Sequence, residues 1–210
     1  MKFLNFDRVL CLAPHPDDSE YSIAGIVLKY QDTIFDLVCL SAGSKYDSTS
    51  SKDRYTEVEN AWKITNAKNY NLYFSDYLHL KDRELELRIR DLETEFINKQ
   101  QYDCILVSSE QDSHHEHIFV SSLAAPLSRI KPFSIIQYRS PSTLDTWMPN
   151  LFVSIDDVYE TKKLMLKEFT SQANKTYLED RVLDGFHTVF QSMKKGKGFV
   201  ESFKIVICYE

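Results

Sequence analysis

The segment that sets the architecture reads Ala13-Pro14-His15-Pro16-Asp17-Asp18-Ser19-Glu20. It directly follows the apolar run Val9–Leu12, which is typical of a buried strand, and it precedes a helical pattern. Four ionisable side chains within six residues are costly to crowd together unless something neutralises them. At the carboxyl end of a strand, where open α/β sheets form their ligand crevice, such a cluster favours a metal site with a base beside it. The alternative is a solvated acidic turn in which Asp18 or Ser19 caps the next helix.

A second cluster reads Asp112-Ser113-His114-His115-Glu116-His117 and also follows an apolar run, Ile105–Val107. Three of the six histidines of the chain fall within its four last positions. His114 and His117 are three residues apart, so they share one face if the segment begins a helix. A lone histidine is usually packed or solvated, but two histidine and carboxylate clusters that each follow a strand-like run predict a metal centre.

Together these segments resemble the zinc-dependent N-acetylglucosaminyl-phosphatidylinositol de-N-acetylase (PIG-L/LmbE-like) family. That family has His-Pro-Asp-Asp-x-Glu after its first strand and Asp-x-His-x-(Asp/Glu)-His later. The resemblance covers most of the chain, because Arg54 and Glu57 fit the family's Arg-x-x-Glu helix. Further matches are the strand and helix positions 149–155, Lys162 and 171–172, and the closing (Tyr/Phe)-x-Glu-x-Phe segment at 198–203. The first two motifs are specific, whereas the later ones would mean little alone.

By this resemblance the metal ligands are His15, Asp18 and His117, with zinc as the expected cofactor and another divalent transition metal as an alternative. A catalytic zinc ion with three protein ligands keeps a position for water and lowers its pKa toward ~7, so metal-bound water is the implied nucleophile. Asp17, adjacent to Asp18 but pointing elsewhere, is the implied general base. His114 is implied to stabilise the tetrahedral oxyanion or to protonate the departing amine.

Other candidate site residues rest on weaker signals. Asp112 or Glu116 is expected to hold His114 in its useful tautomer, although the family usually has Asp where this chain has Glu116. His115 lies one position away from the ligand face and is expected to be a bystander. Hydroxyl groups of a substrate need polar neighbours. The substrate-binding candidates are Arg54, Ser44, Asp47 and Tyr138.

The reaction that the resemblance implies is hydrolysis of an acetamide on an N-acetylglucosamine-type amino sugar or its conjugate, releasing acetate and a free amine. One alternative is a zinc amidohydrolase that acts on a non-sugar amide or formamide. Another is a non-catalytic member that binds metal or ligand, but such a protein has no need of a base such as Asp17. A phosphate-ester hydrolase would favour two metals and more carboxylate ligands than the sequence offers.

Length and composition indicate one soluble domain over residues 1–210, with 43% hydrophobic and 27% charged residues. A net charge of −6 argues against a nucleic-acid partner. No apolar run approaches the ~20 residues needed to span a bilayer, so membrane insertion is not expected. The first seven residues are charged too early for a signal peptide, which favours a cytoplasmic location. The expected partner is a small N-acetylated sugar, and a homo-oligomer is possible.

Apolar runs alternate with helical patterns along the chain. After the first run, apolar residues at positions 23, 26, 27 and 30 fall on one face of a helix, and Ile34–Leu40 is the next strand-like run. This alternation predicts an α/β fold, a Rossmann-like three-layer sandwich with a mostly parallel sheet flanked by helices. A long helix is expected around 85–96, and a last strand over 203–209. Each of the four cysteines, at 11, 39, 104 and 208, lies in an apolar run and is expected to be a buried free thiol.

Overall fold

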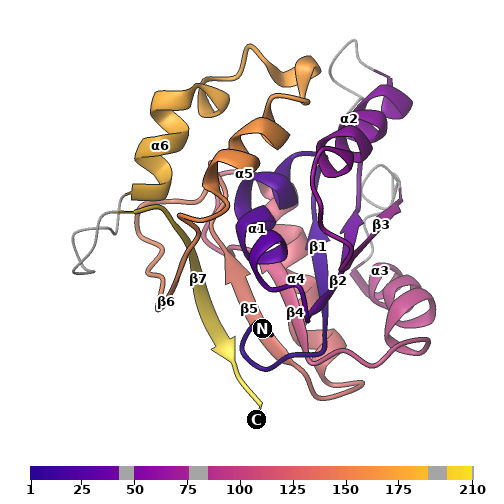
Figure 1. Cartoon of the computed structure of the whole chain (residues 1–210). Coiled ribbons are helices and arrows are strands. Elements are labelled where there is room, and N and C mark those ends of the chain that lie inside the picture. The colour runs from indigo at the N-terminus through magenta and orange to yellow at the C-terminus, as the bar shows by residue number, and fades with distance from the viewer. Residues whose placement is uncertain (43–49, 76–84, 189–197, 210) are drawn as a thin grey trace.

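The computed structural model describes residues 1–42, 50–75, 85–188 and 198–209. Within these ranges the chain forms one seven-stranded sheet with the order β3-β2-β1-β4-β5-β7-β6 (Figure 1). The strands are β1 (Arg8–Ala13), β2 (Ile34–Cys39), β3 (Tyr70–Phe74), β4 (Cys104–Ser108), β5 (Ser134–Tyr138), β6 (Leu151–Ser154) and β7 (Val200–Ile207). The helices are α1 (Asp18–Lys29), α2 (Ser51–Lys63), α3 (Leu85–Leu92), α4 (His115–Ser128), α5 (Tyr159–Leu166) and α6 (Asp180–Thr188). Short turns are the π-helical η2 (Glu93–Ile97) and the 3₁₀ turns η3 (Thr170–Gln172) and η4 (Thr176–Leu178).

The sheet is mostly parallel, as the sequence predicts. Strands β1 to β5 pair in parallel, whereas β7 runs antiparallel to both β5 and β6. Each parallel neighbour is reached through a helix, which is the connection that parallel strands require. The predicted α/β fold with helices flanking a mostly parallel sheet is therefore confirmed.

Helices cover both faces of this sheet, and the strand residues divide between two apolar cores. On β1, Val9 and Cys11 belong to the core shared with α1, α2, α5 and α6, while Leu10 and Leu12 belong to the core shared with α3, η2 and α4. Side chains alternate between faces along a strand, so a strand buried on both sides is apolar at most positions, with buried exceptions such as Asp36 on β2 and Gln137 on β5. This explains why the strands read as continuous apolar runs in the sequence.

The order of the strands places a crevice beside β1. The chain proceeds from β1 to β2 and β3 on one side, then returns to lay β4 on the other side of β1. The loops that leave β1 and β4 therefore run in opposite directions and leave a crevice between them. This point, where the strand order reverses, is where open α/β sheets bind ligands. The two polar clusters of the sequence follow these two strands, so both reach the same crevice.

Two local expectations are corrected. The helix expected around 85–96 is α-helical only to Leu92 and continues as the π-helical η2. The last strand begins at Val200 and ends at Ile207, so Cys208 follows it and is exposed, unlike Cys11, Cys39 and Cys104. An apolar run predicts a strand but does not show where pairing with its neighbour stops.

No helix within the described ranges is both long and apolar enough to cross a membrane.

Candidate active site

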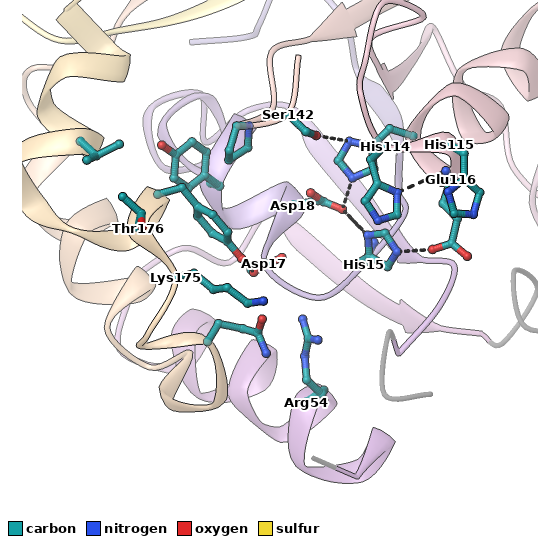
Figure 2. Close-up of a pocket in the computed structure, with 16 residues that line it drawn as sticks. His15, Asp17, Asp18, Arg54, His114, His115, Glu116, Ser142, Lys175 and Thr176 are labelled. Atoms are coloured by element: carbon teal, nitrogen blue, oxygen red, sulfur yellow. Dashed lines mark hydrogen bonds and ion pairs between the residues drawn. The ribbon is translucent and has the colours of Figure 1, made fainter. Parts of the chain in front are cut away.

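Three metal-ligand side chains meet around one carboxylate oxygen in the crevice. Oδ2 of Asp18 lies 3.2 Å from Nδ1 of His15 and 3.3 Å from Nε2 of His117. One ligand-type atom from each of the three residues lies within 4.8 Å of the others. His15 and Asp18 follow β1, and His117 lies in the first turn of α4 after β4. The structure thus brings together the three residues that the family resemblance implied as ligands, and Figure 2 shows two of them, His15 and Asp18, facing each other.

The turn after β1 separates two neighbouring carboxylates. Asp17 is the N-cap of α1 and has φ of 94°, a left-handed conformation that costs a residue with a Cβ some free energy. Asp18 then accepts the backbone N–H of His15 at 2.9 Å and faces the histidines, while Oδ2 of Asp17 accepts from the hydroxyl of Tyr177 at 2.8 Å. Figure 2 shows Asp17 on the side of Lys175 and Arg54, away from the histidines. Adjacent carboxylates with different partners can perform different tasks.

Asp112 holds the ring of His117. Its Oδ2 lies 3.1 Å from Nδ1 of His117 and accepts from the hydroxyl of Ser140 at 2.7 Å. A carboxylate behind a ligand histidine fixes the ring orientation and leaves the other nitrogen for a metal. Asp112 also accepts the backbone N–H of His114 at 2.8 Å, a contact with the main chain of His114 and not with its ring. The sequence suggested that Asp112 would hold the ring of His114, whereas the ring that it holds is that of His117.

His114 is the N-cap of α4, and its ring has a partner of an unexpected kind. Nδ1 accepts the backbone N–H of Glu116 at 3.3 Å, so a neutral ring carries its proton on Nε2. Burial, and then the positive charges of His15 and His117, lower the pKa of His114. The tautomer of His114 is thus set by a main-chain group, while the carboxylate Oε2 of Glu116 lies 2.5 Å from Nε2 of His15.

The pKa values of the cluster indicate where positive charge is favoured. Burial opposes protonation of His15 and His117, but their contacts with carboxylates outweigh it and raise the pKa to about 9 for His15 and about 10 for His117. Burial acts to raise the pKa of Asp18, yet the charges and hydrogen bonds of the two histidines lower it well below its usual range. The carboxylates around His15 and His117, namely Asp18, Asp112 and Glu116, therefore favour positive charge at this place. A divalent cation at the same place would supply that charge, so the donor set fits a metal ion.

Asp17 has the opposite tendency to Asp18. Burial, and then the negative charge of Asp18, raise the pKa of Asp17 to about 7, while Arg54 and Tyr177 oppose the rise. A carboxylate with a pKa close to neutrality is suited to take up and release a proton at physiological pH.

A cavity of 840 Å³ opens onto this cluster. Its far side consists of residues from α1, α2, the segment around η3 and η4, and the start of α6. The lining there includes Tyr21, Arg54, Gln172, Lys175, Thr176, Tyr177 and Val182. Its size is within the range of small-molecule sites.

The four substrate-binding candidates have different outcomes. Arg54 is buried, lines the cavity and donates to the carbonyl oxygen of Pro16 at 2.8 Å. Tyr138 is fully buried and donates to the carbonyl oxygen of Leu12 at 3.0 Å, so it supports β1 and lies outside the cavity lining. Ser44 and Asp47 lie outside the described residues.

Sequence reasoning missed the wall that η3 and η4 contribute. Only 171–172 had a motif match there, and Tyr177, which contacts the proposed base, gave no periodic or motif signal. His115, expected to be a bystander, stacks on His114 with ring centroids 5.2 Å apart and lines the cavity.

A histidine and carboxylate cluster that could hold a metal ion, with a second carboxylate beside it, lies at the carboxyl edge of a mostly parallel sheet and forms a candidate active site. The family model of the GlcNAc-PI de-N-acetylases (PIG-L) matches residues 10–127, which is more than half of the chain. The chain therefore belongs to the PIG-L family, a family of deacetylases.

Several known proteins are similar to this chain in sequence or in fold. The uncharacterized deacetylase YaiS of Escherichia coli K12 is 26% identical over 160 residues, covering 74% of this chain and 86% of YaiS. The structure of the N,N'-diacetylchitobiose deacetylase from Pyrococcus horikoshii has a TM-score of 0.78 at 22% identity, covering 98% of this chain and 85% of that one. GalB, the 4-carboxy-2-hydroxymuconate hydratase from Pseudomonas putida, has a TM-score of 0.75 at 17% identity, covering 100% and 98%. Since a hydratase shares the fold, the reaction must be argued from the site.

Proposed function

We propose that the protein is a zinc-dependent hydrolase that removes the N-acetyl group from an N-acetylglucosamine-type amino sugar or its conjugate. The observation that carries this proposal is the division of labour between two adjacent carboxylates. Asp18 lies between His15 and His117, whereas Asp17 is directed to Tyr177 and has a pKa raised to about 7. A ligand set with a separate base beside it is what hydrolysis by an activated water requires.

The donor set consists of two imidazole nitrogens and one carboxylate oxygen, from His15, His117 and Asp18, which zinc accepts and other divalent transition metals tolerate. A zinc ion bound there would polarise the amide carbonyl and make a water molecule acidic enough to attack at neutral pH. Asp112 fixes the ring of His117, so that its Nε2 points toward Asp18. The protein therefore presents an ordered set of ligands.

Asp17 accepts the proton of the attacking water. Its backbone is held at the N-cap of α1, and the hydroxyl of Tyr177 occupies Oδ2, so Oδ1 remains for the water. Arg54 favours the ionised form of Asp17, which keeps part of the population ready to act as a base.

His114 serves the other end of the reaction. Because Nδ1 accepts from the main chain, Nε2 carries the proton that can be donated to the carbonyl oxygen as it becomes negative, or to the departing amine. The lowered pKa of His114 makes its protonated form a stronger acid.

The substrate class rests on the family and on the cavity. A volume of 840 Å³ accommodates an amino sugar together with part of a conjugate, and the far wall carries the amine of Lys175, the guanidinium of Arg54 and the hydroxyl of Thr176 for its hydroxyl groups. Arg54 is our first candidate for substrate contact, and the Pyrococcus relative is named for the deacetylation of a sugar. The single domain, the cytoplasmic location and a possible homo-oligomer stay predictions from the sequence.

The test compares Asp17→Asn with His117→Ala. Metal content would be measured for each purified protein, and acetate release would be followed with free, nucleotide-linked, lipid-linked and thiol-precursor conjugates of N-acetylglucosamine. Asp17→Asn should keep its metal and lose turnover by about 10²–10⁴-fold, the usual contribution of general-base catalysis. His117→Ala should lose the metal.

Asp157→Asn is the matched control, since Asp157 is an exposed carboxylate paired with Lys29. It should keep both metal and activity. Full turnover in Asp17→Asn would show that Asp17 is not the base. If wild-type protein released no acetate from any of the conjugates, the substrate class would be wrong.

A further inference from the structure

Each of the two histidine ligands has a carboxylate on the nitrogen that faces away from Asp18. For His117 this is Asp112, at 3.1 Å from Nδ1. For His15 it is Glu116, whose Oε2 lies 2.5 Å from Nε2, while Nδ1 of the same ring faces Asp18 at 3.2 Å. His15 is thus held between two carboxylates that lie on opposite nitrogens of its ring.

We propose that Glu116 is a positioning residue for the metal ligand His15, and this proposal rests on the metal site of the proposed function. A histidine binds a metal through a nitrogen that carries no proton, so the remaining proton must sit on the other nitrogen. Glu116 accepts the Nε2 proton, which leaves the lone pair of Nδ1 directed toward Asp18 and the ion. Partners of this kind orient the ring and raise the basicity of the ligand.

The length of the Glu116 side chain is essential to this role. Its backbone N–H is occupied by the ring of His114, so the main chain at the start of α4 is held in place. From that position the carboxylate reaches a residue that is 101 positions away in the sequence. An aspartate would be shorter by about one C–C bond of 1.5 Å, which would leave its oxygen about 4 Å from Nε2, too far for a hydrogen bond.

Burial makes the contact consequential. The side chain of His15 is 14% exposed and that of Glu116 is 10% exposed, so water competes little for either group. If Glu116 no longer accepted from His15, the Nε2–H group of His15 would stay buried without a partner, and its lost hydration would cost free energy. Glu116 therefore connects two functional histidines, His114 through its main chain and His15 through its carboxylate.

A different role for the same group is a second metal site. One ligand-type atom from each of His15, His114 and Glu116 also lies within 4.8 Å of the others. Two ions would require His15 to donate both ring nitrogens and therefore to lose both protons. Nδ1 of His114 is also already occupied by the N–H of Glu116. The geometry favours one ion and a positioning carboxylate.

The experiment measures zinc affinity by competition with a chelator, and stoichiometry by equilibrium dialysis, for wild type, Glu116→Asp, Glu116→Gln and Glu110→Gln. Wild type should bind one ion. Glu116→Asp should bind it 10–100-fold more weakly, the usual effect of losing such a partner. Glu116→Gln should lose less, because its amide oxygen can still accept from His15. Glu110→Gln removes a half-exposed carboxylate that pairs with Lys204, and its affinity should equal that of wild type.

A spectroscopic signature accompanies the affinity. In zinc-loaded wild type, the Nε2 proton of His15 should appear in proton–nitrogen NMR spectra as a strongly hydrogen-bonded signal, and in Glu116→Asp this signal should exchange away. Thermal melting of the metal-free proteins would verify that each variant folds. If Glu116→Asp does not fold, the zinc affinity of the conservative variant Glu116→Gln is the test.

The outcomes separate the two proposals. One ion in wild type and an affinity within about twofold of it in both Glu116 variants would overturn this inference alone. Two ions in wild type, of which only the weaker is lost in Glu116→Gln, would also overturn it, because Glu116 would then be a ligand. If wild type bound no ion, the metal site of the proposed function would fail first, and this inference with it.

Discussion

At the scale of single residues, the absence of one methyl group allows α1 to approach β7. Glu201 on β7 accepts the backbone N–H of Gly25 at 2.7 Å and that of Ile26 at 2.8 Å, in the interior of α1. A Cβ at Gly25 would lie 2.5 Å from Cγ2 of Ile155 and 2.8 Å from Oε1 of Glu201. Only glycine fits here, since α1 begins at the histidine and carboxylate cluster and packs closely against the last strand.

Replacing Gly25 by alanine should therefore destabilise the protein by about 1–3 kcal/mol, the usual cost of overpacking a filled core. Urea unfolding would measure the change. Gly185→Ala is the matched control, because Gly185 lies in α6 and a Cβ there would meet nothing within 4 Å. That variant should gain about 0.5–1 kcal/mol from helix propensity. Equal stability of wild type and Gly25→Ala would contradict the packing argument.

The stability of the protein should also depend on His187. This side chain is buried, and Nδ1 contacts the carbonyl oxygen of Val200 at 3.0 Å. Burial, and then the positive charges of Lys162 and Arg139, lower the pKa of His187 well below its ordinary value of 6.5. Below that value the unfolded chain binds a proton and the folded chain does not, so stability must fall as the pH falls.

In wild type, protonation of His187 in the unfolded chain should lower the free energy of unfolding by about 1.4 kcal/mol between about pH 7.5 and pH 5.5. The lower pH is about one unit below the unfolded pKa, and each such unit changes the free energy by about 1.4 kcal/mol. The same pH difference in His187→Phe should be smaller by about this amount. Urea unfolding of both proteins with a chelator present would measure it. A pH difference that is identical in the two proteins would show that His187 takes up a proton in the folded state.

At the scale of elements, α2 carries two residues of one motif with separate tasks. Arg54 reaches the cavity and the loop after β1, while Glu57 holds η3. The carboxylate of Glu57 accepts from the hydroxyl of Thr170 at 2.9 Å, and from the N–H and hydroxyl of Ser171 at 2.7 Å each. Tyr177 and Leu178 of η4 pack against the apolar core, whereas the bonds from Glu57 attach η3 to α2, so these bonds help to determine where the far wall of the cavity stands.

We expect Glu57→Gln to weaken this attachment, because an amide replaces one charged acceptor and brings N–H groups against donors. Hydrogen bonds to charged groups contribute about 1.5–3 kcal/mol, so a loss of about 2 kcal/mol is expected, together with a higher KM for the substrate. Urea unfolding and steady-state kinetics would measure both. Glu59→Gln changes an exposed carboxylate on the same helix, paired with Lys63, and should leave KM unaltered. A normal KM in Glu57→Gln would contradict the role of η3 in forming the wall.

At the scale of the whole molecule, a buried ion pair joins α5 to the last strand. Nζ of Lys162 on α5 donates to Oε1 of Glu201 on β7 at 2.6 Å, and both side chains are fully buried. Burial lowers the pKa of Lys162, and the charge of Glu201 opposes this. Because Glu201 also binds α1, the pair connects the antiparallel edge of the sheet to the helix that carries Asp17 and Asp18.

Removing only the cation should leave a buried negative charge, and Lys162→Met should cost about 3–5 kcal/mol. The double variant Lys162→Met/Glu201→Gln should recover at least about 1 kcal/mol of this, because no charge remains and an acceptor for α1 is kept. Urea unfolding would measure all of these variants. Lys204→Met, which removes a half-exposed pair with Glu110, should change stability little. A double variant no more stable than Lys162→Met would show that the pair is not coupled.

Much of this molecule follows from local patterns. Continuous apolar runs separated by helical stripes are sufficient to predict a parallel sheet covered on both faces, because strands buried on both sides carry mostly apolar side chains on each face. That the two histidine and carboxylate clusters meet also follows, since the carboxyl ends of neighbouring parallel strands share one edge. The choice of His15, Asp18 and His117 within these clusters came from the resemblance to the PIG-L family. For these features the physical information lies within a few residues of each position.

Only the tertiary structure decided which partner each functional group meets. Tyr177 contacts Asp17 from 160 positions away, and Glu116 reaches His15 across 101 positions, so neither pairing has a local signal. The same holds for Glu57 with η3 and for the exposure of Cys208, which depends on where β7 stops pairing. Hydrogen bonds and burial act over a few ångströms in space regardless of sequence separation, and the packing of whole elements determines which residues come within that range.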